Sequence, residues 1–206
     1  MSPNNQTSDS SRERLFSLLR KQGVVRARDV EKLGIAREYL RRLRVEGFLE
    51  QPSRGLYVLA ESQPTQWQSI VEVCKKAPHA VVCLLTALQY HGLTTQLPHE
   101  VWIAIGNSSW QPKLDHVNLR VTRYSASSLA YGVQETLVDG VNVRVFNPAK
   151  TIADCFKFRG KVGLDVAIES LREGLAKRTV SVDDLWKAAG VCRVGTVIRP
   201  YIESLA

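Results

Sequence analysis

Residues 25–58 constrain the fold of this chain most, because apolar, basic and glycine positions alternate there at short and regular spacing. The stretch reads VRARDVEKLGIAREYLRRLRVEGFLEQPSRGLYV. Glycine favours the end of a helix, and the cluster PSRG favours a tight turn between strands. The predicted elements are helices over residues 29–33 and 36–46, ended by Gly34 and Gly47, and strands over residues 48–50 and 56–59. This order is typical of a helix-turn-helix followed by a two-stranded wing.

The second predicted helix has two faces when its residues are placed about 100° apart. The face expected to pack on the preceding helix holds Ala36, Leu40 and Leu43, with Tyr39 at its border. The opposite face holds Arg37, Glu38, Arg41, Arg42 and Val45, with Arg44 on the flank. The helix therefore combines a buried stripe with an outward row of guanidinium groups.

An arginine-rich helix of this kind fits the major groove of B-DNA, which admits one helix. Arginine can bind guanine O6 and N7 or pair with phosphates. The turn between the strands is expected to hold Arg54 at the tip of the wing. Arg28 lies just before the predicted helix over residues 29–33, at a position where helix-turn-helix proteins contact phosphates. The predicted DNA-binding residues are Arg28, Arg37, Arg41, Arg42, Arg44 and Arg54. The alternative is an ordinary solvated basic helix followed by a hairpin.

The charge of the chain is concentrated at the same end. The net charge is +8 over 206 residues, and residues 1–60 hold 12 Lys and Arg against 7 Asp and Glu. A clustered positive charge attracts phosphate and raises encounter rates. The sequence shows neither an apolar run of the ~20 residues that a membrane span needs nor a secretory signal at its start. We therefore expect a cytoplasmic protein that binds double-stranded DNA.

We predict an α+β protein with two domains. Residues 10–60 form a winged helix-turn-helix domain, residues 61–65 a linker, and residues 66–206 a mixed α+β domain. Ser10 and Glu13 fit a capping box at the start of a first helix that ends at Gly23. That helix is expected to pack on Val30, Leu33, Leu40 and Leu43.

The second domain combines helical patterns with short apolar strands. Asp139-Gly140 is a strong hairpin signal, and Asn147-Pro148 is a strong helix start. The predicted helices cover residues 67–76, 83–90, 147–155, 164–176, 181–186 and 194–205, and the predicted strands cover residues 100–105, 117–124, 133–138 and 141–146. We expect Trp102 and Trp110 to pack in the core, although a nucleic-acid surface is the alternative for them.

Metal, cofactor and enzyme signals are weak. Cys74, Cys83, Cys155 and Cys192 form no CxxC or zinc-finger spacing, so we expect buried free thiols, no metal and no cofactor. Ser108 and Ser109 before Asp115 resemble a nucleotidyltransferase site, but the second carboxylate is missing. Lys150-Thr151 resembles the end of a P-loop without its glycines. The chain is therefore expected not to be an enzyme.

Two titratable residues of the second domain are given structural roles. Asp154 lies among apolar residues of a predicted helix, so we expect a buried ion pair with an arginine such as Arg120 or Arg123. His91 precedes Gly92 at the predicted end of a helix, where a cation is favoured by the helix dipole. Neither residue is assigned to catalysis.

Several blocks of the sequence resemble the AbiEi-type antitoxins of abortive phage-infection systems. These blocks are GIAREYLRRLRVEGFLEQPSRGLYVLA, CLLTALQYHGLTTQLPHEVWIAI, LRVTRYS and VFNPAKTIADCFKFRGKVGLDVAIESLREGL. The resemblance covers roughly residues 12–180. The resemblance implies a winged-helix repressor of its own operon, with a C-terminal domain linked to antitoxicity. It also implies a nucleotidyltransferase-like toxin encoded by a neighbouring gene. The resemblance does not imply that the two proteins are in direct contact.

Winged helices often bind inverted repeats as pairs, so the expected target is an operator of that kind. Two alternatives remain beside this prediction. One is a winged-helix regulator whose second domain senses a ligand. The other is a DNA-targeted nuclease or nucleotidyltransferase, for which we find no set of carboxylates.

Overall fold

The chain folds into two compact units. The computed structural model describes residues 4–62, 65–114 and 117–205. The first unit consists of Met1–Pro78, Pro112–Val117 and Leu137–Val143, and the second of His79–Gln111, Asn118–Thr136 and Arg144–Ala206. Each unit mixes helices with strands, which confirms the predicted α+β class. The linker predicted at residues 61–65 stays a prediction, and residues 63 and 64 lie outside the described part.

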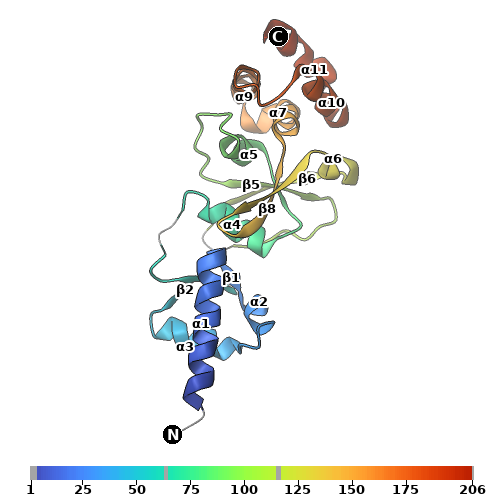
Figure 1. Cartoon of the computed structure of the whole chain (residues 1–206). Helices are drawn as coiled ribbons and strands as arrows, with labels where there is room; N and C mark the ends of the chain where they lie inside the picture. Colours follow the sequence, from blue (N-terminus) through green and yellow to red (C-terminus); the bar gives the residue numbers. More distant parts are fainter. Residues whose placement is uncertain (1–3, 63–64, 115–116, 206) are drawn as a thin grey trace. The chain divides into compact units, whose positions relative to one another are not determined.

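Among the described residues, the first unit contains four helices and a small antiparallel sheet with the strand order β1-β3-β2 (Figure 1). Its elements are α1 (Asn4–Gln22), β1 (Val25–Arg26), α2 (Ala27–Glu31), α3 (Arg37–Val45), β2 (Leu49–Ser53), β3 (Leu56–Leu59) and α4 (Gln68–Lys76). The order of α2, α3, β2 and β3 agrees with the predicted order of two helices followed by two strands. Leu15, Leu19, Val30, Leu40 and Leu43 are buried together in its core.

Three predicted details of this unit are wrong. Helix α1 begins at Asn4, so Ser10 lies within the helix, where its carbonyl accepts a hydrogen bond from Arg14 Nε (3.2 Å). Helix α2 ends at Glu31, and Leu33 lies 40% exposed in the turn instead of in the core. Strand β2 extends to Ser53, because a shift of register between Glu50 and Ser53 accommodates Pro52, which cannot donate a ladder hydrogen bond.

The second unit contains most of a five-stranded sheet with the order β6-β5-β4-β8-β7. Strands β5 and β6 are parallel, as are β4 and β8, whereas β4 and β5 are antiparallel. The elements are β4 (Val81–Val82), α5 (Leu84–Tyr90), β5 (Val101–Gly106), β6 (Leu119–Tyr124), α6 (Ala126–Ala130), β7 (Val133–Val138), β8 (Val141–Phe146), α7 (Pro148–Lys157), α8 (Arg159–Val162), α9 (Leu164–Ala176), α10 (Val182–Cys192) and α11 (Gly195–Leu205).

Several of these elements agree with the sequence-based boundaries. Strands β7 and β8 and helix α9 have the predicted bounds. Asn147 caps α7, since its side-chain oxygen accepts a hydrogen bond from Lys150 N at 2.8 Å, and Pro148 is the first helical residue. Strand β4 and helices α6 and α8, which are short, were not predicted from the sequence. The two-residue strand β4 nevertheless lies in the middle of the sheet, where it joins β5 to β8.

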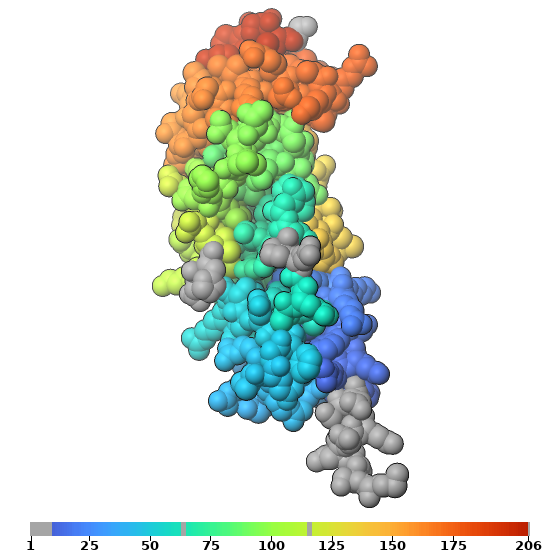
Figure 2. Space-filling view, turned by 90° about the vertical axis from the view of Figure 1, so that its left-hand side faces the viewer, coloured from blue at the N-terminus to red at the C-terminus, as the bar shows by residue number. Residues whose placement is uncertain are grey.

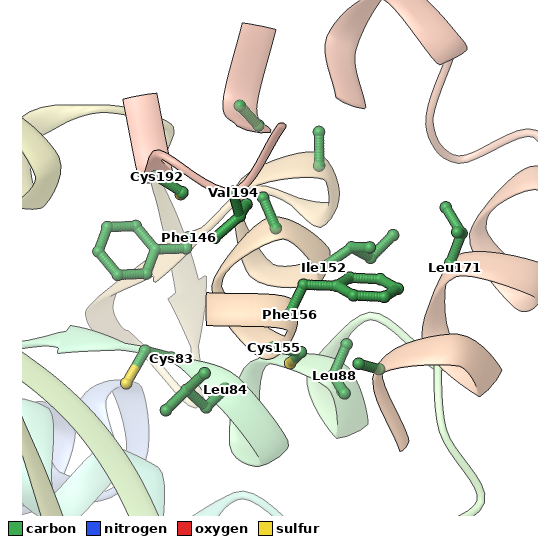
Figure 3. Close-up of a cluster of buried hydrophobic side chains, with 14 of the residues drawn as sticks. Cys83, Leu84, Leu88, Phe146, Ile152, Cys155, Phe156, Leu171, Cys192 and Val194 are labelled. Carbon is green, nitrogen blue, oxygen red and sulfur yellow. The ribbon is translucent and has the colours of Figure 1, made fainter. Parts of the chain in front are cut away.

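Helix α7 lies at the centre of the second unit. It contacts α5, α9, α10 and α11, and Figure 1 shows it between the sheet and these last three helices. In Figure 3, Ile152, Cys155 and Phe156 of α7 are surrounded by Leu88 of α5, Leu171 of α9 and Val194. All of these side chains are buried. The packing of the C-terminal helices therefore depends on α7.

The same helix carries a buried ion pair that differs from the predicted one. Asp154 pairs with Lys150, one helical turn earlier, and both side chains are 0% exposed. Arg120 and Arg123, the expected partners, bind elsewhere: Arg120 lies 3.7 Å from Glu100, and Arg123 donates to the carbonyls of the loop after β5. The prediction of an arginine partner for Asp154 is therefore wrong.

Three further groups surround this ion pair. Tyr124 donates its hydroxyl to Asp154 Oδ2 (3.1 Å), and Cys192 donates its thiol to Asp154 Oδ1 (3.2 Å). The ammonium group of Lys150 lies 4.4 Å from the centre of the Phe146 ring. Burial, with the nearby Asp154 charge, raises the pKa of Cys192 to about 12, so its thiol is protonated near neutral pH.

The aromatic and cysteine predictions have mixed outcomes. The four cysteines are buried thiols that form no disulfide, as predicted. Trp102 is buried, which confirms its predicted place in the core. Trp110 is 60% exposed, so the core position predicted for it is wrong. Within the described residues, no helix has the length and apolar character to cross a membrane.

His91 caps the C-terminal end of α5, but its environment disfavours the cation that we expected there. Burial lowers the pKa of His91, whereas its hydrogen bond to the Phe146 carbonyl (Nε2 to O, 2.7 Å) acts in the opposite direction. The folded protein therefore favours neutral imidazole, and the benefit expected from a charge at the helix end is outweighed by desolvation.

This burial predicts a pH dependence of stability. The unfolded chain takes up a proton on His91 near the ordinary pKa of about 6.5, while the folded chain resists it. The contribution of His91 to the free energy of unfolding is then fully present above that pH and declines as the pH falls below it. Urea unfolding at pH 7.5, 6.5 and 5.5 should show a shallower decline for His91→Gln than for the wild type. Exposed His99 supplies the control His99→Gln, and equal pH slopes for all three proteins would contradict the prediction.

Candidate nucleic-acid interface

Helix α3 packs against the core of the first unit through one apolar stripe. Leu40 is 0% and Leu43 1% exposed, and both pack in the cluster that also contains Val30, while Tyr39 is half-buried at the border. The opposite side of the helix, with Arg37, Glu38, Arg41, Arg42 and Val45, is exposed, as is Arg44. Ala36 differs from the prediction, because it caps the helix in an extended conformation and is exposed.

The start of α3 is tied to the end of α2. Arg37 Nε lies 2.6 Å from Glu31 Oε1, and Arg37 Nη2 donates to Glu31 Oε2 at 2.9 Å. Glu31 raises the pKa of Arg37 through this hydrogen bond and its charge. The intervening turn is closed by Gly34 at φ +75°, a conformation that glycine adopts without steric cost. The pair fixes the direction of Arg37 at the N-terminal end of the helix.

The other arginines of α3 also have partners within the protein. Arg41 Nη1 lies 3.2 Å from Glu38 Oε1, Arg42 Nε lies 3.8 Å from Glu46 Oε1, and Arg44 donates to Gln51 of β2. The Arg41 and Arg42 side chains remain 69% and 57% exposed. Exposed ion pairs contribute about 0–1 kcal/mol each, so a phosphate or a base edge can replace these acceptors at little cost.

Arg28 and Arg54 form a second location, on α2 and on the turn between β2 and β3. Both are exposed. The turn consists of Arg54 and Gly55 alone, and Ala27 N donates to Gly55 O at 3.1 Å. Lys76 of α4 donates to the carbonyl of Arg54 (2.7 Å). These hydrogen bonds therefore hold the turn against the start of α2.

The helix-turn-helix segment has an excess of positive charge. Residues 27–45 contain six basic residues, among them Lys32, against Asp29, Glu31 and Glu38. Figure 2 shows the light-blue part of the chain, which includes α3, at the surface of the first unit. A surface of this charge attracts phosphate, and arginine, the main residue type in the exposed row of α3, is able to bind guanine edges in the major groove.

Three contributors to this surface were missed from the sequence. Glu31 orients Arg37, Gln51 holds Arg44, and Lys32 adds an exposed cation. Lys32 could have been found, because it lies in the same basic segment. The partners Glu31 and Gln51 lie on α2 and β2, six and seven residues from their arginines. The rule for pairs at i, i+3 and i, i+4 within one helix does not predict such contacts.

The structure offers little for metal or phosphoryl-transfer chemistry. Among the described residues, no group of three or more His, Cys, Asp or Glu could hold a metal ion. Asp115, the carboxylate of the nucleotidyltransferase alternative, lies outside the described residues. Lys150, the lysine of the P-loop alternative, is fully buried in its pair with Asp154.

The first unit has a recognisable relative among known families. Residues 13–60 match the family model described as "Transcriptional regulator, AbiEi antitoxin". The predicted resemblance is confirmed for this segment. The matched segment includes α2, α3, β2 and β3, so the exposed arginines of α3 lie inside it. The resemblance of the later sequence blocks, beyond residue 60, stays a prediction.

A solved structure shares the fold over nearly the whole chain. It is the crystal structure of the RV2827C protein from Mycobacterium tuberculosis, which is 14% identical to this chain, with a TM-score of 0.63. The alignment covers 95% of this chain and 80% of that one. Identity this low establishes the fold alone. No curated protein matches the sequence significantly.

Proposed function

We propose that this protein is a DNA-binding transcriptional repressor that acts as the antitoxin of a toxin–antitoxin operon. It represses its own promoter and counters a nucleotidyltransferase-like toxin encoded nearby. The observation that carries the proposal is the exposed row of arginines on α3, within a segment that matches antitoxin regulators. The roles follow from that match and from the charge of the surface.

In this proposal the two arginine locations have different tasks. Arg37, Arg41 and Arg42 enter the major groove on α3, where they contact bases or phosphates. Arg44 and Arg54 contact phosphates, as does Arg28. Contacts to phosphates position the helix, and contacts to base edges select the sequence. The target is an operator with inverted repeats, since two copies of one reading helix are matched by two half-sites.

The test is binding of the full chain to its own upstream DNA, compared with scrambled DNA of equal length. We expect selective binding that weakens on the order of 100-fold between 50 and 200 mM salt if about four phosphates are contacted. Equal and weak binding to both DNAs would overturn the repressor role. The antitoxin role is tested by expressing the adjacent gene with and without this protein, and growth that this protein fails to restore would overturn it.

A further inference from the structure

Val45 is the most exposed apolar side chain of α3. Val45 is 78% exposed at the end of α3, while Leu40 and Leu43 of the same helix are buried. At about 100° per residue, Val45 lies between Arg41 and Arg42 on the outward side. A single exposed valine is common on protein surfaces, so its exposure alone shows nothing. Its position among the candidate DNA-binding residues gives it significance.

The neighbours of Val45 leave it uncovered. Arg41 is drawn towards Glu38, and Arg42 lies over the Tyr39 ring, 4.7 Å from its centre. These four residues line a shallow hollow together with Val45. The valine therefore presents its two methyl groups outward between two guanidinium groups.

The spacing of the row matches a known way of reading DNA. Residues 38, 41, 42 and 45 follow the pattern i, i+3, i+4, i+7, which homeodomain reading helices use for their contacts in the major groove. That groove offers one apolar feature on the natural base edges, the C5-methyl group of thymine. An apolar side chain at the fourth position can cover this methyl group and remove both surfaces from water.

We propose that Val45 is a specificity-determining residue that contacts the C5-methyl group of a pyrimidine in the operator. The inference rests on the proposed function, because it requires α3 to enter the major groove. Arg41 and Arg42 hold the helix in the groove, and Val45 selects a methylated edge at one position of each half-site. Thymine and 5-methylcytosine both present this group.

The experiment removes one methyl group at a time. Each thymine of the bound upstream DNA is replaced singly by deoxyuridine, which changes nothing else on the base edge. We expect the wild type to lose about fourfold in affinity at one position of each half-site, the effect of one buried methyl group. Val45→Ala should bind the two DNAs equally at that position. Leu97→Ala, which truncates a side chain that is 76% exposed in the second unit, should behave like the wild type.

A second arm separates the two sources of the methyl group. Each cytosine is replaced singly by 5-methylcytosine, and a gain in affinity that Val45→Ala abolishes would assign the contact to methylated cytosine. The inference is overturned if the wild type binds selectively but no deoxyuridine or 5-methylcytosine position depends on Val45. If the upstream DNA is not bound selectively at all, the proposed function fails, and this inference fails with it. Urea unfolding verifies that Val45→Ala folds, as expected for alanine in an exposed helix.

Discussion

Replacing Lys150 by methionine is expected to lower the free energy of unfolding by about 3–5 kcal/mol, the usual effect of removing one partner of a buried ion pair. Methionine fills a similar volume but supplies no charge. Asp154 then keeps the Tyr124 hydroxyl and the Cys192 thiol as hydrogen-bond donors, while its cation is gone. An uncompensated carboxylate in this interior must either bear the desolvation penalty or bind a proton.

Urea denaturation of the full chain measures the effect, and the chain supplies a matched control. Glu173 of α9 and Lys177, which caps the C-terminal end of that helix, form an ion pair with the same i, i+4 spacing, 3.0 Å apart, but Lys177 is 51% exposed. Lys177→Met should lower stability by less than about 1 kcal/mol, because exposed pairs contribute little. Equal losses for the two variants would contradict a special role of burial.

A double variant separates the contribution of the ion pair from the contribution of the packing of the lysine side chain. Lys150→Met combined with Asp154→Leu removes both charges, and buried pairs replaced by apolar residues often lose little stability. We expect the double variant to be more stable than Lys150→Met alone, although Tyr124 loses its acceptor. A double variant at least as unstable as the single one would show that the packing of Lys150 matters more than its charge.

Arg41→Ala is expected to weaken operator binding by about 1–3 kcal/mol, or roughly 5- to 150-fold, and to relax the preference at one base pair. Arg41 lies on the outward row of α3 beside Arg42 and Val45, and its side chain is 69% exposed. The loss of one base contact changes the ranking of sequences, whereas the loss of one phosphate contact weakens all sequences alike.

Binding to a panel of single-base operator variants separates these two effects. The control is Arg172→Ala, which removes an exposed arginine from α9 in the second unit and should leave affinity and preference unchanged. A uniform loss over the panel would assign Arg41 to a phosphate, with a salt dependence reduced by about one contact. Unchanged affinity together with unchanged preference would remove Arg41 from the interface.

The sequence was most informative where local rules decide the structure. Gly34 adopts φ +75°, so the turn between α2 and α3 could be placed before the structure was known. Asp139-Gly140 and Asn147-Pro148 gave the hairpin and the start of α7 for the same reason. The two faces of α3 followed from helical periodicity. The locations of the candidate arginines were predictable from these rules, and their contacts with DNA stay predictions.

The errors arose where distant residues decide the outcome. Ser10 satisfied a capping rule, yet α1 continues before it to Asn4. Strand β4 has only two residues and forms because β5 and β8 lie on either side of it, which no local pattern encodes. The partner of Asp154 was expected among arginines, but it is Lys150, and lysine is rarely fully buried. The rings of Tyr124 and Phe146 beside Lys150 made that exception possible.

The C-terminal stretch restricts how the proposed antitoxin role can be mapped along the chain. Cys192 binds Asp154, and Val194, Ile198 and Ile202 are buried in the cluster around α7. A protein shortened before these residues would expose the interior of its second unit, so any loss of activity would report misfolding instead of a missing contact. Substitutions at exposed positions of α11, such as Arg199 and Glu203, leave that interior intact and are the sound way to search for a toxin-facing surface.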